Sequence, residues 1–348
     1  MNTKKLLLTL AAAGLALLAM VAASFADRPS TAGATVLPRP VTYTITGPYA
    51  YENLTIFLIH GEDQLKNKTF LTLQEALQQK KVIVYETQQV NQLTIENLSV
   101  HEEIFVQAGD IVKGGKQDRV IAFDVIVPAR SGKMPIASFC VEAGRWTPRG
   151  QENAAAFEVS RDQAPTKDLK LAIRKDMAQR DVWGKVAESQ AKLEGNLGGP
   201  VRAAASRSSL QLTLENQKLQ EAVKKYVTKL QPIIEGQNDV IGYAVAVNGV
   251  LDSADVYASH ALFLKMWPTL LKGSAVEAVT EFKKGAPAVL VTKQMVLDFL
   301  ADADQGKPSH RAVTKRVQII QQETKKNIVF TCADEEQHIA IRRSYVHK

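Results

Sequence analysis

The sequence predicts an α+β fold, with a β-rich, sandwich-like N-terminal half and a helical and mixed C-terminal half. Short runs of β-branched and apolar residues, separated by turn residues, recur between residues 54 and 142. Apolar residues then repeat with helical spacing from residue 169 onwards. Strand-like runs return at 240–247 and after residue 313, so that strands and helices are segregated rather than alternating.

The first 26 residues have the three parts of a secretory signal peptide. Two lysines precede an uncharged apolar run over 6–23, and small residues at Ser24 and Ala26 form a cleavage motif before Asp27. The alternative is an uncleaved membrane anchor, since the run is about as long as a short transmembrane helix. Its alanine content and the cleavage motif favour removal. We therefore expect an exported protein, periplasmic or extracellular, that is soluble and unattached to a membrane after cleavage.

Composition limits the classes of partner. The formal net charge is +7, and loss of the two signal-peptide lysines leaves about +5. Basic and acidic residues are interleaved, and no basic block has aromatic partners, so nucleic-acid binding is not indicated. The two cysteines, Cys140 and Cys332, could pair in an oxidising compartment. Their apolar strand contexts favour buried free thiols instead.

The N-terminal half divides into an irregular leader and a β-rich region. Four prolines among Ser, Thr and Gly predict the leader over 27–50, and the β-rich region follows over 51–195. Its first strand is expected at 54–59. A short helix is expected at 71–80, with Thr72 as the N-cap and Glu75 at the third helical position. Further strands are expected at 82–85, 93–100, 103–107, 119–127 and 135–142.

The C-terminal half begins with helices and ends with strands. A helix over 169–193 stops at a Gly-rich stretch, and 196–209 is predicted to be a flexible linker. The remaining residues, 210–348, form an α+β region that we expect to pack on the β-rich one. Its expected elements are helices at 210–230, 259–271 and 291–303, a strand at 240–247 with an Asn248–Gly249 hairpin turn, and two or three antiparallel strands within 313–345.

Several familiar motifs fail on inspection. Residues 109–117 resemble a phosphate-binding loop, but the lysine is misplaced and a strand-like run follows instead of a helix. Residues 302–306 resemble the start of a calcium loop, but the glycine is misplaced. The six histidines have no zinc-binding spacing, and there is no G-x-S-x-G motif. The sequence therefore indicates no metal site and identifies no cofactor.

One segment, residues 109–146, is dense in Gly, Arg, Gln, Glu and Trp. If the strand ending near Glu142 neighbours the strand beginning at Arg119, then Gln117, Arg119, Glu142 and Arg145 converge at one rim of a sheet, with Trp146 as an apolar wall. Arginine forks could hold an anion, and the indole could stack on a flat ring. The alternative interpretation is structural: the glycines make turns, and Glu142 pairs with an arginine to fix a corner.

The same segment resembles a known family. Gly-Asp-Ile-Val-Lys-Gly-Gly-Lys-Gln-Asp-Arg (109–119), followed by Phe-Cys-Val-Glu-Ala-Gly-Arg-Trp (139–146), is similar to the signature of the ARG and rhodanese-phosphatase superfamily-associated protein domain. The resemblance extends loosely over 45–300. It implies chemistry related to ADP-ribose or to nucleotide-derived molecules. Asp110 departs from the Glu expected at that position. The positions that the resemblance marks are Glu142 and Arg145 as catalytic candidates and Lys113, Gln117, Arg119 and Trp146 as ligand-binding candidates.

Three functions stay open at this point. The first is binding of a small anionic, sugar-like or nucleotide-like ligand, or a structural role, without catalysis; it predicts that Glu142 is tightly paired and closed to solvent. The second is a hydrolase or transferase acting on an ADP-ribose-like or phosphorylated molecule. It places Glu142, Arg119 and Arg145 around an open cleft, with Glu142 as acid or base. The third is a protein-interaction module that docks through the edge of the C-terminal sheet and exposes an apolar patch.

Overall fold

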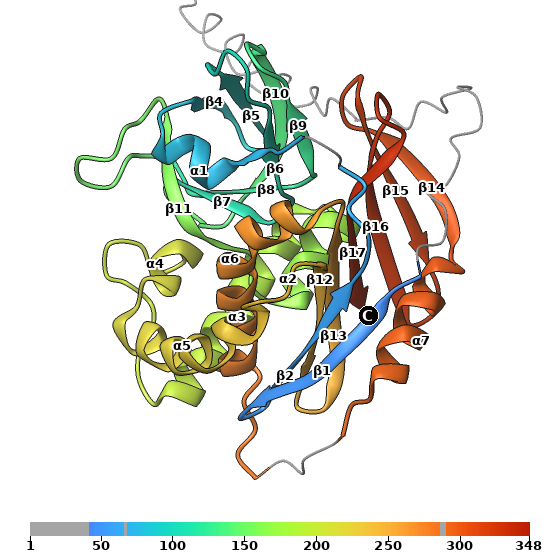
Figure 1. The fold of residues 1–348 in the computed structure, drawn as a ribbon. Coiled ribbons are helices and arrows are strands. Elements are labelled where there is room, and N and C mark those ends of the chain that lie inside the picture. Colours follow the sequence, from blue (N-terminus) through green and yellow to red (C-terminus); the bar gives the residue numbers. More distant parts are fainter. Residues whose placement is uncertain (1–41, 66–67, 286–289) are drawn as a thin grey trace, which may run out of the picture. The chain divides into compact units, whose positions relative to one another are not determined.

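The computed structural model of the chain describes residues 42–65, 68–285 and 290–348 (Figure 1). The predicted signal peptide and residues 27–41 of the predicted leader lie outside this part. The described residues contain three β-sheets and helices, and their N-terminal half is strand-rich, which confirms the α+β class. Among the helices that the structure describes, none is both long enough and apolar enough to cross a membrane.

The largest sheet has eight antiparallel strands drawn from both ends of the chain. The predicted hairpin turn at Asn248–Gly249 is present between the strands Val240–Val247 and Val250–Tyr257. The first strand, Thr44–Tyr51, lies almost entirely inside the range 27–50 predicted to be an irregular leader, and it pairs with the next strand despite Pro48. In spatial order the strands are β1 (Thr44–Tyr51), β2 (Leu54–His60), β12 (Val240–Val247), β13 (Val250–Tyr257), β17 (Ile339–His347), β16 (Asn327–Asp334), β15 (Val317–Glu323) and β14 (Lys307–Ala312).

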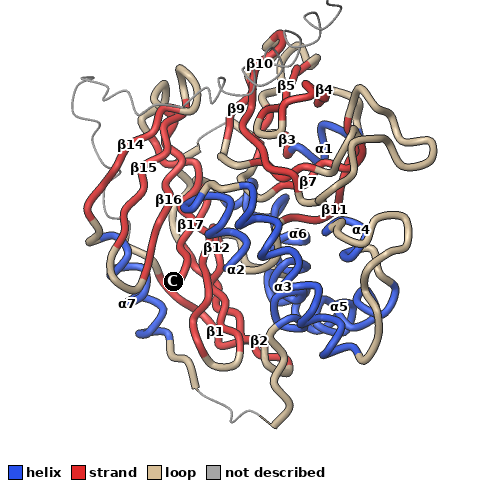
Figure 2. The backbone as a smooth tube through the Cα atoms, turned by 180° about the vertical axis from the view of Figure 1, so that it is seen from behind, coloured by secondary structure: helices blue, strands red, loops and turns tan. Residues whose placement is uncertain are grey.

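Both faces of this sheet are covered, and β2 shows how. Successive side chains of a strand point to opposite faces. Leu54, Ile56 and Leu58 join the core under the helices, whereas Phe57 and Ile59 join a second core. Helices α6 (His260–Thr280) and α5 (Gln217–Leu230) lie on the first face, and α7 (Lys293–Asp304) lies on the other (Figures 1 and 2). Continuous apolar runs such as 54–59 are therefore expected here.

The other two sheets contain the predicted β-rich segment. The predicted strand 119–127 is divided in two, because the buried side chain of Asp124 accepts hydrogen bonds at this point instead of facing a strand neighbour. The six-stranded sheet has the order β11 (Phe157–Gln163), β7 (Asp110–Gly114), β8 (Arg119–Ile121), β10 (Gly132–Cys140), β5 (Gln92–Asn97) and β4 (Val82–Gln89), and the small sheet has the order β3 (Leu71–Thr72), β6 (Ile104–Val106) and β9 (Val125–Val127).

Two of the predicted helices are interrupted. The predicted helix at 71–80 is present as a shorter helix, and Thr72 and Glu75 form the expected capping box. The predicted helix at 169–193 is broken at Met177, which has a left-handed backbone (φ 53°) after a π-helical turn. The predicted helix at 210–230 restarts at Asn216, whose side chain caps the second part. The remaining helices are α1 (Leu73–Gln78), α2 (Lys167–Leu171), the π-helical turn (Ala172–Asp176), α3 (Gln179–Leu197), α4 (Leu210–Leu214) and a 3-10 turn (Gln231–Ile234).

The segment 196–209, predicted to be a flexible linker, is partly buried. Val201 and Ser209 have almost no exposed surface, and the hydroxyl of Ser209 accepts a hydrogen bond from the backbone of Leu212 to cap α4. The residues that the structure describes, from 42 onwards, belong to one compact unit. The β-rich and helical regions therefore share their packing, and residue 209 is part of the core rather than of a hinge.

Candidate functional site

The two ends of the 109–146 segment meet where β8 pairs with β10. Cys140 lies opposite Arg119 in the antiparallel register, which places Glu142 beside the turn that precedes β8. Gln117 donates from Nε2 to the Glu142 carbonyl oxygen (2.9 Å), and the backbone amide of Asp118 donates to Glu142 Oε2 (3.2 Å). Sequence pattern and structure agree that this rim brings Gln117, Arg119, Glu142 and Arg145 into one region.

Around Glu142 the structure forms a dense ion-pair cluster. Arg145 donates from Nε to Glu142 Oε1 at 2.7 Å. Arg149 forms a bidentate pair with Asp118, at 2.8 Å from Nη1 to Oδ2 and 2.6 Å from Nη2 to Oδ1. It also lies 3.0 Å from Glu152 and 3.4 Å from Glu142. Burial alone would lower the pKa of Arg149, but its hydrogen bonds to Asp118 and Glu152 raise it. We call Asp118, Glu142, Arg145, Arg149 and Glu152 the corner cluster.

Arg119 lies beside this cluster but binds different partners. Its side chain is completely buried and lies 3.3 Å from the Glu86 carboxylate, which is itself buried. The guanidinium also contacts the sulfur of Cys140. Its Cζ atom lies 5.9 Å from the ring centroid of Trp146, a cation–π contact. Burial is the main reason that the pKa of the Cys140 thiol is raised to about 11. The buried side chain of Arg119 therefore packs against one side of the exposed Trp146 ring.

Trp146 and Lys113 differ from the other candidates in position. Trp146 is 47% exposed, so it is an outward-facing ring rather than a wall of a closed site. Lys113 lies on β7 and pairs with Glu215 at 2.7 Å, outside the corner cluster. Gln117 and Arg145 thus both contact Glu142, whereas Lys113 pairs with Glu215 outside the corner cluster.

The corner cluster satisfies its own charges. Each arginine of the cluster directs its guanidinium at carboxylates or at main-chain carbonyl oxygens, including those of Gly114 and Gly115. Glu142 and Asp118 have no exposed surface. A group in this position cannot reach a substrate atom without displacing its partners. The cluster therefore fastens the loop after β10 to the turn between β7 and β8.

Sequence reasoning missed Asp118 and Arg149, the bidentate pair at the centre of the cluster. Asp118 stands inside the quoted signature, but a carboxylate next to arginines gives no spacing signal of its own. Arg149 follows Pro148 in an irregular loop, where no periodicity applies. Only the fold brings the two side chains together.

A second buried polar cluster joins the sheets and includes Asp110. Arg342 on β17 lies 2.8 Å from Asp124 and 2.7 Å from Asp255 on β13, and all three are buried. Asp124 also accepts a hydrogen bond from the backbone amide of Ala108. Burial raises the pKa of Asp110 to about 7, despite a hydrogen bond from the Gln107 amide. The charges that act on Asp110 are those of Arg342 and Asp124. Asp110 is therefore associated with this cluster rather than with the one around Glu142.

A third set of buried acids lies between the large sheet and its helices. Asp252 is the extra residue of a β-bulge, since Ser253 pairs with Val245 and Leu251 with Ala246. Burial, together with mutual repulsion between Asp252 and Glu277 of α6, raises the pKa of Glu277, and burial raises that of Asp252. Sequence reasoning gave no indication of this pair. Across the residues with described positions, no three His, Cys, Asp or Glu side chains are arranged to hold a metal ion.

The comparisons with known proteins agree with the resemblance carried by the signature. No curated protein and no solved structure matches the chain. The family model described as the ARG and Rhodanese-Phosphatase-superfamily-associated Protein domain matches residues 42–345. This match extends further in both directions than the 45–300 range predicted from the sequence, and it covers all three sheets. The chain therefore belongs to the ARG and Rhodanese-Phosphatase-superfamily-associated Protein domain family.

Proposed function

We propose that this chain is an exported protein that binds a sugar-like or nucleotide-like small molecule, without catalysis, by stacking a ring on Trp146. The observation that carries the proposal is the 47% exposure of Trp146 in a loop that is otherwise fixed by buried ion pairs. Large aromatic side chains at a surface are favourable contact points, because they offer a flat apolar face at little cost in conformational entropy.

The loop geometry supports a preorganised platform. Arg145 and Arg149 stand on either side of Trp146 in the sequence, and both are held by buried carboxylates. Arg119 lies against the indole at 5.9 Å, so one side of the ring is already occupied. Rigid presentation lowers the entropy cost of binding. The arginine forks are used within the protein, which favours a ring contact over an anion contact.

The two alternatives receive less support. A hydrolase or transferase that uses Glu142 requires this carboxylate to line an open cleft, and Glu142 is fully buried and ion-paired. A module that docks through the edge of the C-terminal sheet requires an apolar edge. The edge strand β14 has the sequence Lys-Pro-Ser-His-Arg-Ala and is largely exposed. Charged residues and proline on an edge are devices that discourage strand pairing.

Removal of the indole tests the binding proposal. We expect the purified protein to bind ADP-ribose, or its ribose or adenosine part, and Trp146→Ala to weaken binding by roughly 5-fold to 150-fold, because ring stacking contributes about 1–3 kcal/mol. Calorimetry measures the affinity, and a ligand at a hundred times its dissociation constant should stabilise the fold by about 2.7 kcal/mol. The matched control is Phe282→Ala, which removes another exposed aromatic side chain (38%). Equal affinity of Trp146→Ala and the unmodified protein would sink the proposal.

The export part of the proposal has a separate test. The apolar run over 6–23 and the small residues at 24–26 predict cleavage before Asp27. Mass mapping of the protein recovered outside the cytoplasm of producing cells should find Asp27 as the first residue. An intact Met1 on protein that stays with the cytoplasm or the membrane contradicts export of a cleaved chain.

A further inference from the structure

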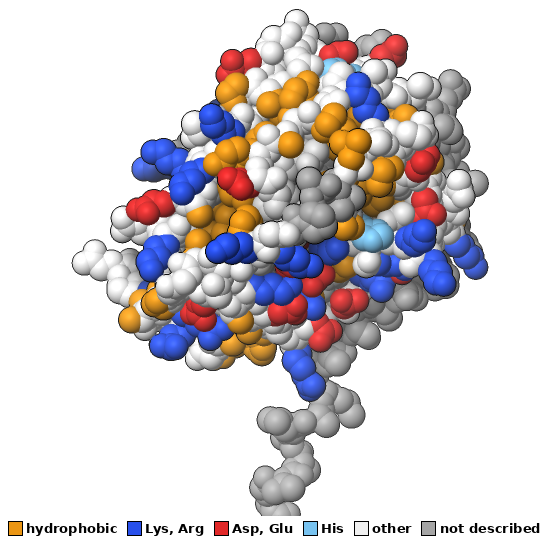
Figure 3. Space-filling view, turned by 90° about the horizontal axis from the view of Figure 1, so that it is seen from below, with side chains coloured by type: hydrophobic (Ala, Val, Ile, Leu, Met, Phe, Trp, Pro, Cys, Tyr) orange, Lys and Arg blue, Asp and Glu red, His pale blue; other side chains and the backbone are white. Residues whose placement is uncertain are grey.

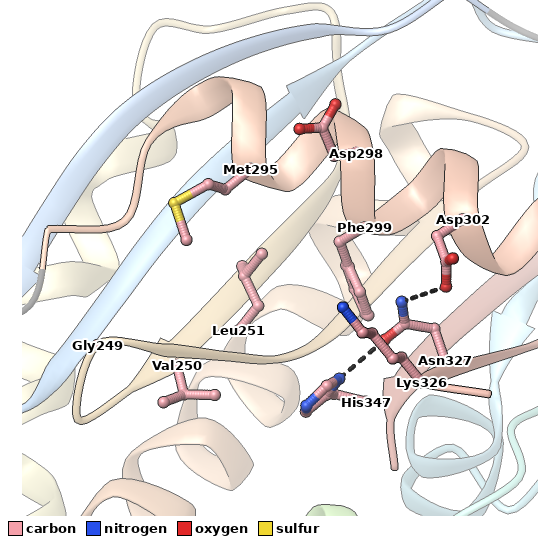
Figure 4. Close-up of a pocket in the computed structure, with 10 residues that line it drawn as sticks. All are labelled: Gly249, Val250, Leu251, Met295, Asp298, Phe299, Asp302, Lys326, Asn327 and His347. Carbon is pink, nitrogen blue, oxygen red and sulfur yellow. Dashed lines mark hydrogen bonds between the residues drawn. The ribbon is translucent and has the colours of Figure 1, made fainter. Parts of the chain in front are cut away.

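Two surface features outside the signature loop select no ligand by its charge. The hollow of about 540 Å³ beside α7 has the carboxylates of Asp298 and Asp302 and the single lysine Lys326, whose charge already acts on Asp302 (Figure 4). On the face seen from below, hydrophobic side chains are interspersed with side chains of both charges (Figure 3). A more specific arrangement lies at the edge of the largest sheet, on β1, β2 and the turn before β12.

The register of these three strands brings Thr46, His60 and Asp239 together. Thr46 lies opposite Leu58 on β1, and His60, two residues further along β2, points to the same face because side chains alternate along a strand. His60 also pairs with Val240, the first residue of β12, and Asp239 directly precedes that residue. His60 is 14 positions from Thr46 and 179 positions from Asp239 in the sequence, so no local spacing marks the three residues.

Two hydrogen bonds join the three side chains in a row. His60 Nδ1 lies 2.8 Å from Asp239 Oδ1, and His60 Nε2 lies 2.7 Å from Thr46 Oγ1. The hydrogen bond from His60 lowers the pKa of Asp239, so this group is a carboxylate that only accepts, and the imidazole must donate from Nδ1. In the neutral ring Nε2 then carries no proton and accepts from the Thr46 hydroxyl. A hydroxyl bonded to a base that a carboxylate orients is the arrangement that activates a nucleophile.

The position of β1 leaves the hydroxyl within reach of a small molecule. His60 is buried, whereas Thr46 is partly exposed. In the part of the chain that the structure describes, β1 is an edge strand of its sheet, so its outer side has no neighbouring strand. The pairing of β1 with β2 also shifts between Thr46 and Tyr49. Such bulges recur beside active sites, where they redirect a side chain.

We propose that Thr46, His60 and Asp239 form a nucleophilic site at which the Thr46 hydroxyl takes the acyl group of a small activated ester and passes it to water. Thr46 Oγ1 attacks the carbonyl carbon while its proton moves to His60 Nε2. The bond between that carbon and the leaving oxygen breaks, and the leaving alcohol takes the proton from Nε2. Water then attacks the acyl-threonine with His60 again as base, which releases the carboxylic acid and restores the hydroxyl. Asp239 is a positioning residue that holds the imidazole and stabilises its protonated form.

Reaction with p-nitrophenyl acetate tests the proposal, because its acetyl group is small and activated. Nitrophenol should be released, and peptide mass mapping should find the acetyl group on Thr46. Thr46→Val should abolish acetylation of this position, and Thr46→Ser, which keeps a hydroxyl, should retain it. His60→Gln should slow acetylation of Thr46 about a hundredfold or more, because a positioned base contributes roughly 10²–10⁴-fold. The matched control His101→Gln removes an exposed histidine elsewhere and should leave the rate unchanged.

Two further readouts separate chemistry from a structural role. The rate of Thr46 acetylation should rise with pH as the ring of His60 loses its proton, and this rise decides the matter if His60→Gln does not fold. Asp239→Asn should slow acetylation less than His60→Gln does, because this carboxylate is 68% exposed and its charge is screened. Trp146→Ala should react like the unmodified protein, since ring binding there is independent of this site.

Three results overturn the proposal. One is an acetyl group on other residues but not on Thr46. The second is equal acetylation of Thr46 in His60→Gln and in His101→Gln. The third is a rate of Thr46 acetylation in the unmodified protein that does not change with pH.

Discussion

Replacement of Arg342 by Met is expected to lower the free energy of unfolding by about 3–5 kcal/mol, the cost of removing one member of a buried ion pair. Arg342 is the partner of two buried carboxylates, at 2.8 Å from Asp124 and 2.7 Å from Asp255. Burial by itself raises the pKa of Asp255, but the charges of Arg342 and Lys170, together with hydrogen bonds from Ser344 and Arg342, hold the pKa below its usual value. The loss is large because Asp255 then stays buried without an ion-pair partner, and Asp124 keeps only Arg174, 4.0 Å away. Urea-induced unfolding measures it.

Two further proteins make this expectation precise. Arg180→Met removes an exposed arginine of α3 and should change the free energy of unfolding by less than about 0.5 kcal/mol. If Arg342→Met yields no folded protein, the double variant Asp255→Asn, Arg342→Met should restore folding, because the buried charges that then remain, Asp124 and Arg174, lie 4.0 Å apart and can pair. A stability of Arg342→Met close to that of the unmodified protein would show that Asp124 and Asp255 are not buried against it.

Replacement of Arg149 by Ala should give a loss of stability nearly as large. Arg149 forms both bonds of a bidentate pair with Asp118, which has no exposed surface, and it also contacts Glu142 and Glu152. Its loss leaves Asp118 with Arg145 at 3.8 Å and with the hydroxyl of Ser209 at 2.9 Å. We expect a cost of about 3 kcal/mol, a large share of the roughly 5–15 kcal/mol by which domains are stable.

The shape of the side chain matters as well as its charge. Arg149→Lys keeps the charge but cannot form the planar fork, and its loss should be intermediate. Arg161→Ala removes an exposed arginine of β11 and is the matched control. Thermal and urea unfolding should rank the control as the most stable, then the lysine variant, then Arg149→Ala. If Arg149→Ala is as stable as the control, the corner cluster does not hold the loop.

The elements that could be predicted from the sequence are those fixed by neighbouring residues. The capping box of Thr72 and Glu75 and the turn at Asn248–Gly249 depend on residues a few positions apart, and both are present. The division of 119–127 depends on Asp124 and its partner Arg342, more than 200 positions away, which no local pattern contains. The break at Met177 also depends on a distant residue. It follows a turn in which the Cζ atom of Arg174 lies 4.2 Å from the ring centroid of Phe330.

For the candidate site, the sequence predicted which side chains meet but not whether they are open to solvent. The meeting of Gln117 and Glu142 follows from two strands and one register, so that a hypothesis built on strand ends placed them correctly. The choice between a structural corner and a catalytic cleft depends on burial. Glu142 is closed to solvent through Arg145 and Arg149, which are loop residues whose positions no periodicity defines.

The order of strands in the largest sheet sets when the chain can fold. His60 on β2 pairs with Val240 on β12, about 180 residues later, and β13 pairs with β17, which is made about 90 residues after it. Synthesis at about 5–20 residues per second separates β2 from β12 by roughly 10–40 s. During this interval the apolar strand β2 has only β1 as a partner, and closure of so long a loop is slow. The large sheet cannot be completed until β17 has been made, and for a protein exported as proposed this delay would keep the chain unfolded enough to be threaded across a membrane.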